Sequence, residues 1–177
     1  GINFLKEKVE NADELLNDFF FIPDKSQEKA LENILSLSNG RLQKYGNYDF
    51  SKNIQIITPT KKGALGTKEL NKKLQETINP PSEEKNERKY LDAIFREGDR
   101  IMQIKNNYDI YWEKKEPKLE MGKGVFNGEY GTILKINELE KQIKIQFDDE
   151  KVVWYTFEEL EQIEHSYSIT VHKAQRK

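Results

Sequence analysis

The sequence contains no cysteine and only two histidines in 177 residues. The first absence excludes a disulfide scaffold and thiolate catalysis, and the second argues against a zinc site. No apolar run approaches the roughly 20 residues that span a bilayer, and the first residues lack the charged-then-apolar layout of a signal peptide. We therefore expect a cytoplasmic protein that is stabilised by packing and has no membrane partner.

Neither sign of charge is in excess. The 29 basic residues nearly cancel the 31 acidic residues, which leaves a net charge of −2. Overall charge therefore predicts no affinity for nucleic acid, and any such binding must come from a local patch. Hydrophobic residues make up 36% of the chain and aromatic residues 11%, a composition typical of a folded protein. The length fits one domain or two small ones, and we favour two.

Two catalytic signatures are also missing. The carboxylates are scattered through predicted helices and turns, with no pair isolated by apolar neighbours, so acid–base catalysis has no candidate residues. No Gly-x-x-x-x-Gly-Lys-Ser/Thr loop occurs anywhere in the chain, and such a loop is what cradles nucleotide phosphates in many ATPases. We therefore expect this polypeptide alone not to hydrolyse a nucleotide.

The first half of the chain alternates strand and helix patterns. Phe19–Ile22 and Ile54–Ile57 are short apolar runs that predict buried strands. Between them Asp24 and Ser26 can each cap a helix with apolar positions at helical spacing, and later Thr67 can cap another that ends before Pro80. This order predicts an α/β layer with parallel strands.

The second half has a different character. Residues 81–89 are charged and lack apolar periodicity, which indicates a linker. Short β-rich runs joined by turn residues then predict a small antiparallel barrel of SH3-like size. These runs are Arg100–Ile104, Gly131–Ile136, Gln142–Phe147 and Val152–Phe157. Finally, Tyr167–Thr170 returns to strand character, and Val171 can open a helix.

Two strand ends carry hydroxyl and basic side chains. The last predicted strand ends in Thr170, followed by His172, Lys173 and Gln175, while the earlier one leads into Thr58, Thr60, Lys61, Lys62 and Gly63. In an open parallel sheet both ends lie at the carboxyl edge, where ligands usually bind. A helix start beside a lysine there suits a phosphate. Taken singly, the segments also fit a polar helix start and a solvated turn.

Another candidate segment follows the first strand of the predicted barrel. Lys105, Asn106, Asn107 and Tyr108 combine a cation, two amides and an aromatic ring. Such a set can stack on bases and contact phosphates of single-stranded nucleic acid. The alternative is a barrel loop whose aromatic residues cover the core.

The order of these motifs resembles the RecD/TraA-type superfamily 1 DNA helicases. The resemblance covers most of the chain from about Phe19 onward, and several unrelated segments agree. These segments are Ile56–Thr67, Leu70–Pro80, Phe95–Gln103, Lys105–Tyr108, Gly124–Gly131 and Tyr167–Gln175. One departure is that the family continues after the glutamine with glycine, a small residue and glutamate, whereas this chain has Arg176 and Lys177.

The resemblance implies a fold class and a division into domains. The fold would be α/β, part of a RecA-like parallel-sheet motor domain with an inserted SH3-like β-barrel. Residues 1–82 would form the first part of the second motor domain, and residues 83–94 a linker. Residues 95–163 would then form the barrel, and residues 164–177 would return to the motor domain.

The resemblance also implies roles for particular residues. Thr58, Thr60, Lys61, Lys62 and Gly63 match helicase motif IV, which lies near the nucleotide cleft, and Gln175 would join them there. Thr170, His172 and Lys173 match motif V, which touches the single strand. The barrel flanks the DNA path, so Lys105, Asn106, Asn107 and Tyr108 would also contact DNA. No catalytic residue and no metal ligand is expected in this chain.

The implied parent protein is an ATP-dependent DNA helicase that moves 5′ to 3′ along single-stranded DNA in repair or recombination. It would use ATP and magnesium, with the phosphate loop and the magnesium carboxylates on an N-terminal motor domain that this chain lacks, so the fragment alone should bind neither tightly. A different hypothesis is a non-enzymatic module whose SH3-like barrel binds a protein partner. A third is a nucleotide-binding regulator that does not bind DNA.

Overall fold

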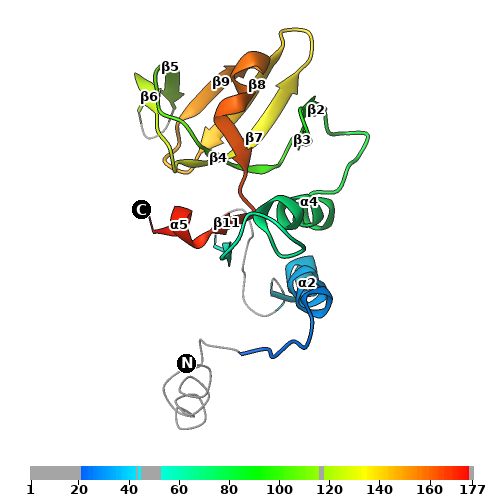
Figure 1. Ribbon diagram of the computed structural model, residues 1–177. Coiled ribbons are helices and arrows are strands. Elements are labelled where there is room, and N and C mark those ends of the chain that lie inside the picture. Colours follow the sequence, from blue (N-terminus) through cyan, green and yellow to red (C-terminus); the bar gives the residue numbers. More distant parts are fainter. Residues whose placement is uncertain (1–20, 43, 45–52, 116–117, 176–177) are drawn as a thin grey trace.

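A computed structural model describes residues 21–42, 44, 53–115 and 118–175 of the chain (Figure 1). The structure has an α/β part and an antiparallel β-sheet part, which we call the barrel (residues 100–165). Figure 1 shows the barrel at one end, helix α2 near the other end, and helix α4 with strand β11 between them. No helix of the described residues is long and apolar enough to cross a membrane.

The barrel is a seven-stranded antiparallel sheet with the order β10-β4-β7-β8-β9-β5-β6. Its strands alternate buried and more exposed residues, and in β8 the side chains of Ile143, Ile145 and Phe147 point into the core. A short 3-10 helix, η2 (Phe157–Gln162), joins β9 to β10. The strands are β4 (Arg100–Gln103), β5 (Asn107–Lys114), β6 (Glu120–Val125), β7 (Tyr130–Asn137), β8 (Gln142–Phe147), β9 (Val152–Thr156) and β10 (Ile163–His165).

The four β-rich runs predicted in the second half all form strands, but β5, β6 and β10 were not predicted. Strands β5 and β6 are rich in polar and charged residues, and several of their side chains lie on an exposed face. Such strands lack a strong apolar alternation, so the sequence pattern does not distinguish them from loops. The segment Lys105–Tyr108, expected to follow a strand as a loop, leads directly into β5 at Asn107.

The predicted linker, residues 83–94, contains a β-hairpin. Its strands are β2 (Glu87–Tyr90) and β3 (Ala93–Arg96), joined at Leu91, which has a left-handed φ of 51°. The charged residues of β2 alternate between exposed and half-buried positions, and the Arg88 guanidinium lies 4.1 Å from the centre of the Phe157 ring. Charged side chains can pack their aliphatic stems against apolar residues. A segment rich in charged residues can therefore form a strand, although its composition predicts a linker. The division of the chain into domains at these boundaries stays a prediction.

The α/β part contains α2 (Gln27–Ser36) and α4 (Thr67–Ile78). Of the two caps expected for α2, Asp24 and Ser26, Ser26 is the N-cap, since its side chain accepts a hydrogen bond from the Lys29 N–H at 3.2 Å. Gly66, not Thr67, is the N-cap of α4. A Cβ at Gly66 would lie 2.5 Å from the Lys62 carbonyl oxygen, so this close approach of the loop requires glycine. After α2, the segment Leu37–Arg41 contains a kink, because the backbone leaves helical angles at Asn39 and at Gly40, which has a φ of 82°.

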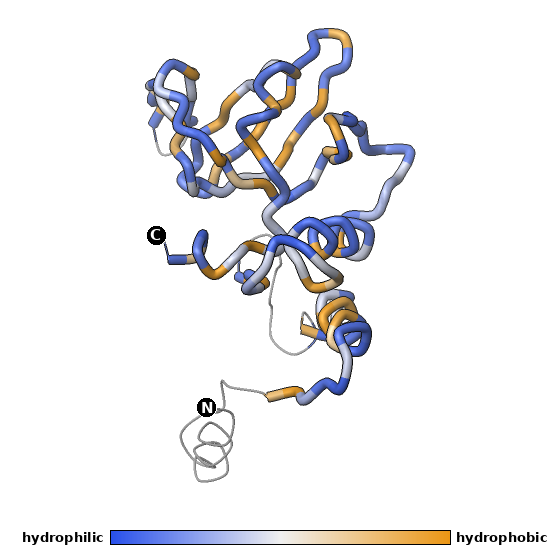
Figure 2. The backbone as a smooth tube through the Cα atoms, in the orientation of Figure 1, coloured by the Kyte–Doolittle hydropathy of each residue, from blue (hydrophilic) through white to orange (hydrophobic). Residues whose placement is uncertain are grey.

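The apolar faces of the two helices form a second core beside that of the barrel. Leu70 and Leu74 of α4 are buried with Tyr167, and apolar residues of α2 pack against them. Figure 2 shows this apolar patch on α2 and the apolar stretches along the strands of the barrel. The predicted helical spacing of apolar residues in both helices is therefore confirmed.

The strand predicted at Phe19–Ile22 is wrong where the structure describes it. Phe21 and Ile22 are 49% and 50% exposed and lie in no strand, while Phe19 and Phe20 fall outside the described residues. The strand β1 (Ile56–Thr58) pairs instead with β11 (Ser168–Thr170), from the other end of the chain. An apolar run indicates burial, but it does not identify what covers it.

Strands β1 and β11 are parallel, and their register places Ile56 opposite Ser168 and Thr58 opposite Thr170. The helix expected after the last strand is α5 (Val171–Ala174). The predicted fold class is therefore confirmed: an α/β part with parallel strands and a barrel inserted between its segments.

Candidate functional site

The ends of β1 and β11 meet at one edge of their parallel pair. Thr58 and Thr170 are the last residues of the two strands, and they lie opposite each other. The loop after β1 and helix α5 after β11 therefore start side by side, as the sequence predicted for a common carboxyl edge. Two segments that are more than 100 residues apart in the sequence thus form one surface.

The loop after β1 uses its hydroxyl groups to hold its own shape. The Thr58 hydroxyl donates to the Leu65 carbonyl at 2.6 Å, and the Thr60 hydroxyl accepts from the Lys62 N–H at 3.2 Å. Gly63 closes the turn with a φ of +86° and accepts a hydrogen bond from the Gly66 N–H. The threonine hydroxyls therefore hold the shape of the loop, and the expected place of Thr58 and Thr60 in a nucleotide cleft stays a prediction.

The lysines of this loop are available to a ligand. Lys61 and Lys62 are exposed, and no carboxylate of the described residues pairs with either. Two neighbouring ammonium groups without a counter-charge form a local positive patch in a chain whose overall charge is balanced.

The segment after β11 also combines a buried threonine with exposed polar residues. Thr170 is only 7% exposed and its side chain does not cap α5, while His172 and Gln175 are exposed. Lys173 makes an ion pair with Glu164 of β10. The positive charge expected from Lys173 at this edge therefore already has a partner, and Arg176 and Lys177 lie outside the described residues.

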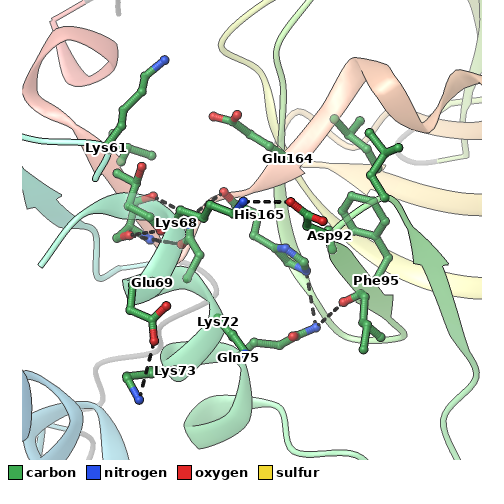
Figure 3. A pocket seen from close by; sticks show the side chains of 18 of the residues that line it. Lys61, Lys68, Glu69, Lys72, Lys73, Gln75, Asp92, Phe95, Glu164 and His165 are labelled. Carbon is green, nitrogen blue, oxygen red and sulfur yellow. Dashed lines mark hydrogen bonds and ion pairs between the residues drawn. The ribbon is translucent and has the colours of Figure 1, made fainter. Parts of the chain in front are cut away.

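An open cleft of about 1350 Å³ runs between the α/β part and the barrel (Figure 3). One side is formed by the loop after β1 and by α4, and the other by the β2–β3 hairpin and β10. Among the residues predicted from the sequence, five line it: Lys61, Lys62, Gly63, Thr170 and Lys173. The structure therefore brings residues of both predicted helicase motifs into one cleft.

Charged side chains face one another across this cleft. Lys68 of α4 and Asp92 of the β2–β3 hairpin form an ion pair of 2.9 Å, which Figure 3 shows, and the Lys68 ammonium lowers the pKa of the Asp92 carboxyl. Both side chains are largely exposed, at 77% and 83%. Ion pairs with this exposure are weak, so a polyanion can displace the carboxylate from the lysine.

The predicted segment on the barrel lies apart from the cleft, because Ile104 lines the cleft but none of the next four residues does. Lys105 pairs with Glu161 at 2.8 Å. The amides of Asn106 and Asn107 bind other residues of the barrel: Asn106 accepts from the Asn127 N–H at 2.9 Å, and Asn107 donates to Gln162 at 2.9 Å. These two asparagines therefore hold the loop.

Two tyrosine rings of this part of the barrel are exposed. Tyr108 is 66% exposed and meets Phe126 edge to face, with 5.6 Å between ring centres. Tyr111 is 65% exposed, and the Lys123 ammonium lies 4.4 Å from the centre of its ring. Sequence reasoning named Tyr108 but missed Phe126 and Lys123, because they come from β6 and the turn after it.

Asn71 positions the strand that carries Thr170, and the sequence analysis missed it. Its side-chain oxygen accepts from the Ser168 N–H at 2.6 Å, and its amide group donates to the His165 carbonyl at 3.0 Å. The available sequence signal was an asparagine beside the apolar position Leu70 of a predicted amphipathic helix. Side-chain amides in such places usually bind backbone groups.

Asp99 is a second missed residue, and it joins the barrel to the α/β part. It is 0% exposed, and groups from both parts surround its carboxyl group. Burial and this carboxyl raise the pKa of the Tyr167 hydroxyl. The partners of Asp99 are Gln75 Nε2 at 2.6 Å, Asn79 Nδ2 at 2.8 Å, the Arg96 N–H at 2.7 Å, the Tyr167 hydroxyl at 2.9 Å and His165 Nε2 at 3.0 Å.

Within the described part of the chain, no three His, Asp or Glu side chains come together in a way that could hold a metal ion. The cleft offers lysines for an anion, and exposed aromatic rings lie on the barrel.

Comparisons with known proteins identify what this chain is similar to. Residues 70–147 match the family model described as the SH3 domain of ATP-dependent RecD-like DNA helicases. The chain is 32% identical over 122 residues to the ATP-dependent RecD2 DNA helicase of Deinococcus radiodurans. That alignment covers 69% of this chain and 14% of the relative, so the chain spans about a seventh of that protein.

Two solved structures of Pif1 helicases are also similar. One contains two coordinating Pif1 helicases at forked double-stranded DNA, with a TM-score of 0.40, 15% identity and coverage of 96% of this chain and 48% of that chain. The other is Bacteroides sp Pif1 in complex with ADP-AlF4, with a TM-score of 0.38, 12% identity and coverage of 96% and 50%. The resemblance to RecD-type superfamily 1 helicases expected from the sequence is confirmed, and it rests on the sequence matches.

Proposed function

We propose that this chain, which resembles the RecD-type superfamily 1 helicases, is the part of an ATP-dependent DNA helicase that lines the path of the single strand. Its α/β part would belong to the second RecA-like motor domain, with the barrel inserted as the SH3-like domain. The family match over residues 70–147 supports the barrel assignment. The other motor domain would belong to a longer protein, because the chain spans only 14% of its RecD2 relative.

The observation that carries the proposal is the register that sets Thr58 opposite Thr170. It joins the segments that resemble motifs IV and V at one edge, beside a cleft that contains Lys61, Lys62 and Lys173. Ammonium groups in an open cleft attract phosphates, and an edge shared by two motifs can couple a nucleotide to a strand of DNA.

ATP and magnesium fit this chain only in part. Lys61 and Lys62 could meet nucleotide phosphates, since neither has an ion-pair partner among the described residues. The sequence has no phosphate loop, and the described residues contain no cluster of three His, Asp or Glu side chains that could hold a metal ion. When bound, ATP would supply the energy for movement. This chain would contribute two cations and Gln175 at the rim of a cleft that the rest of the protein completes.

DNA would contact the motif V edge and the exposed face of the barrel. We propose that Lys173, with Thr170 and His172 beside it, meets phosphates, and that Tyr108 stacks on a base, while Lys105 adds a further cation. Movement from 5′ to 3′ and a role in repair or recombination rest on the resemblance to the family. A stacked base and a gripped phosphate together hold a strand without reading its sequence.

Fluorescence anisotropy of a labelled oligo-thymidine, at low and at higher salt, tests this proposal. Lys173→Ala should weaken binding and make the slope of log K against log salt shallower by about 0.7, because one phosphate contact is lost. Tyr108→Ala should weaken binding by about 1–3 kcal/mol with the slope unchanged, because stacking releases no counterions.

Lys25→Ala is the matched control, because Lys25 is an exposed lysine ahead of α2 and outside the cleft. It should leave both affinity and slope unchanged. Equal effects of Lys25→Ala and Lys173→Ala would mean that binding is diffuse and not located at the motif V edge. No binding by wild type or variants would favour a protein partner for the barrel over DNA.

A further inference from the structure

Two lysines assigned to DNA are each held by a glutamate of one short segment. Lys105 of the barrel pairs with Glu161, with 2.8 Å between Nζ and Oε1, and Lys173 of α5 pairs with Glu164. Glu161 lies in η2 and Glu164 in β10, only three residues later. One acidic segment therefore neutralises a lysine at both places where DNA is expected.

The segment contains negative charge alone. Between Phe157 and His165 the chain has four glutamates and no lysine or arginine. Glu159 is occupied in the capping box of η2 with Thr156, whereas Glu158 is exposed and has no partner among the described residues. Two of the four glutamates, Glu161 and Glu164, form an ion pair with a lysine, and both lysines are proposed to bind DNA.

The backbone of this segment is fixed in place. Leu160 and Ile163 are 1% and 4% exposed in the core of the barrel, and the Gln162 carbonyl accepts from the Ile104 N–H at 2.7 Å. Glu164 precedes His165, which contacts the buried Asp99. Figure 3 shows Glu164 beside the cleft. The lysine side chains, which lie on longer stems, can therefore move away more easily than the backbone that carries the glutamates.

The two ion pairs are open to solvent. The side chains of Lys105 and Glu161 are 51% and 56% exposed, and those of Lys173 and Glu164 are 25% and 47% exposed. Pairs of this kind are weak, so a phosphate can replace the carboxylate. The displaced carboxylate nevertheless stays nearby and repels the phosphate that replaced it.

We propose that Glu161 and Glu164 form an autoinhibitory contact that competes with DNA phosphates for Lys105 and Lys173. This inference rests on the proposed function, because it concerns the regulation of the same DNA-binding surface. In the unbound chain the glutamates occupy both lysines, and a strand binds only by displacing them. Binding is therefore weaker, and less dependent on salt, than the number of lysines predicts. A motor that must release the strand at each step benefits from a grip weakened in this way.

The test uses this chain and labelled oligo-thymidine over a series of salt concentrations. Glu161→Gln and Glu164→Gln should each tighten binding by roughly two- to tenfold at low salt, because a repelling carboxylate is removed and a lysine is freed. Each should also make the salt dependence steeper, by less than the roughly 0.7 in slope that one whole phosphate contact contributes, because the lysine already meets a phosphate in wild type. Glu158→Gln removes the same charge from the same segment without freeing a lysine, so it is the matched control.

A double substitution isolates the contact. With Lys173→Ala as background, Glu164→Gln should lose most of its effect, since there is no lysine left to free, while Glu161→Gln should keep its effect. Thermal unfolding of each variant should match wild type, because the glutamates are exposed.

The outcomes separate this inference from the proposed function. If wild type binds DNA and all three variants, Glu158→Gln, Glu161→Gln and Glu164→Gln, bind with the same affinity and salt slope as wild type, the autoinhibitory contact is overturned. The DNA-binding surface then stays in place. Binding by the glutamine variants but not by wild type supports both. An absence of binding in every variant overturns both, because freed lysines would then have no phosphate to meet.

Discussion

At the residue scale, Glu97 illustrates how one carboxylate ties separate segments together. It accepts hydrogen bonds from the Ile136 N–H at 2.8 Å and from the Asn86 side chain at 3.1 Å. Partial burial acts to raise the pKa of Glu97, but these hydrogen bonds outweigh it and the pKa is lowered. A lowered pKa in the folded state stabilises the fold above the unfolded pKa, and this stability is lost as the pH falls through the folded value.

Glu97→Gln should therefore destabilise the chain at pH 7, by about 1 kcal/mol once solvent screening is allowed for. The difference from wild type should shrink as the pH falls below the folded pKa, because the wild-type carboxylate then becomes protonated. Urea unfolding at pH 7 and at about pH 3 measures this. Glu83→Gln, at an exposed glutamate before β2, should change nothing. A difference that is equal at both pH values would show that the charge of Glu97 has no role.

The roles of single lysines also depended on neighbours that the sequence does not reveal. In the sequence Lys61 and Lys173 have the same setting, because each is a basic residue shortly after a predicted strand. Within the described part of the chain Lys61 has no ion-pair partner, whereas Lys173 pairs with Glu164. A pairing across a cleft depends on which segments meet, and local sequence carries no information on that.

At the scale of elements, the β5–β6 hairpin depends on a close fit between a ring and a glycine. Trp112 of β5 lies opposite Gly122 of β6. A Cβ added at Gly122 would lie 2.3 Å from Trp112 Cζ2. This hairpin forms the edge of the barrel sheet, and it carries exposed Tyr111 and Lys123.

Gly122→Ala should destabilise the barrel by about 1–3 kcal/mol, since the ring of Trp112 must move out of its place. Urea unfolding followed by circular dichroism measures the loss. In a Trp112→Leu background the same glycine substitution should cost much less, because the ring is gone. A cost that does not depend on residue 112 would locate the strain in the backbone of β6.

At the scale of the whole molecule, Asp99 determines whether the two parts behave as one. Its partners come from α4, from the barrel and from the residues just before β11, as described above. Because buried donors without an acceptor are costly, these groups favour one arrangement of barrel and helix. The same arrangement leads through Ser166 and Tyr167 to Thr170 at the cleft.

Asp99→Ala should lower the free energy of unfolding by about 3 kcal/mol or more, because several buried donors lose their acceptor. It should also uncouple the two parts. Both tryptophans, Trp112 and Trp154, lie in the barrel, so their fluorescence reports on it, while far-ultraviolet circular dichroism at 222 nm follows α2 and α4. The two signals should coincide in wild type and separate in the variant.

Asp92→Ala is the control for this experiment, because Asp92 is exposed and its ion pair with Lys68 lies at the surface. Its effect should stay within about 0.5 kcal/mol, with coincident signals. Asp99→Asn, which keeps one acceptor oxygen, should fall between the two. Coincident transitions in Asp99→Ala would mean that apolar packing alone joins the parts.

The elements with a strong local pattern could be predicted from the amino-acid sequence. Helical spacing identified α2 and α4, alternation identified β7, β8 and β9, and the hydroxyl and lysine residues marked the ends of β1 and β11. Each of these signals depends on residues within one or two turns or strand repeats. The resemblance to RecD-type helicases came from the order of such segments along the chain.

Which segments contact one another could be seen only in the tertiary structure. It paired Thr58 with Thr170, built a hairpin where charge indicated a linker, and left Phe21 and Ile22 exposed. It also placed Glu161 and Glu164 on the lysines proposed to hold DNA, and it enclosed Asp99 between the two parts. The physical reason is that burial, ion pairing and hydrogen bonding between distant segments depend on how the chain packs in three dimensions, whereas a sequence pattern reports only on neighbours along the chain.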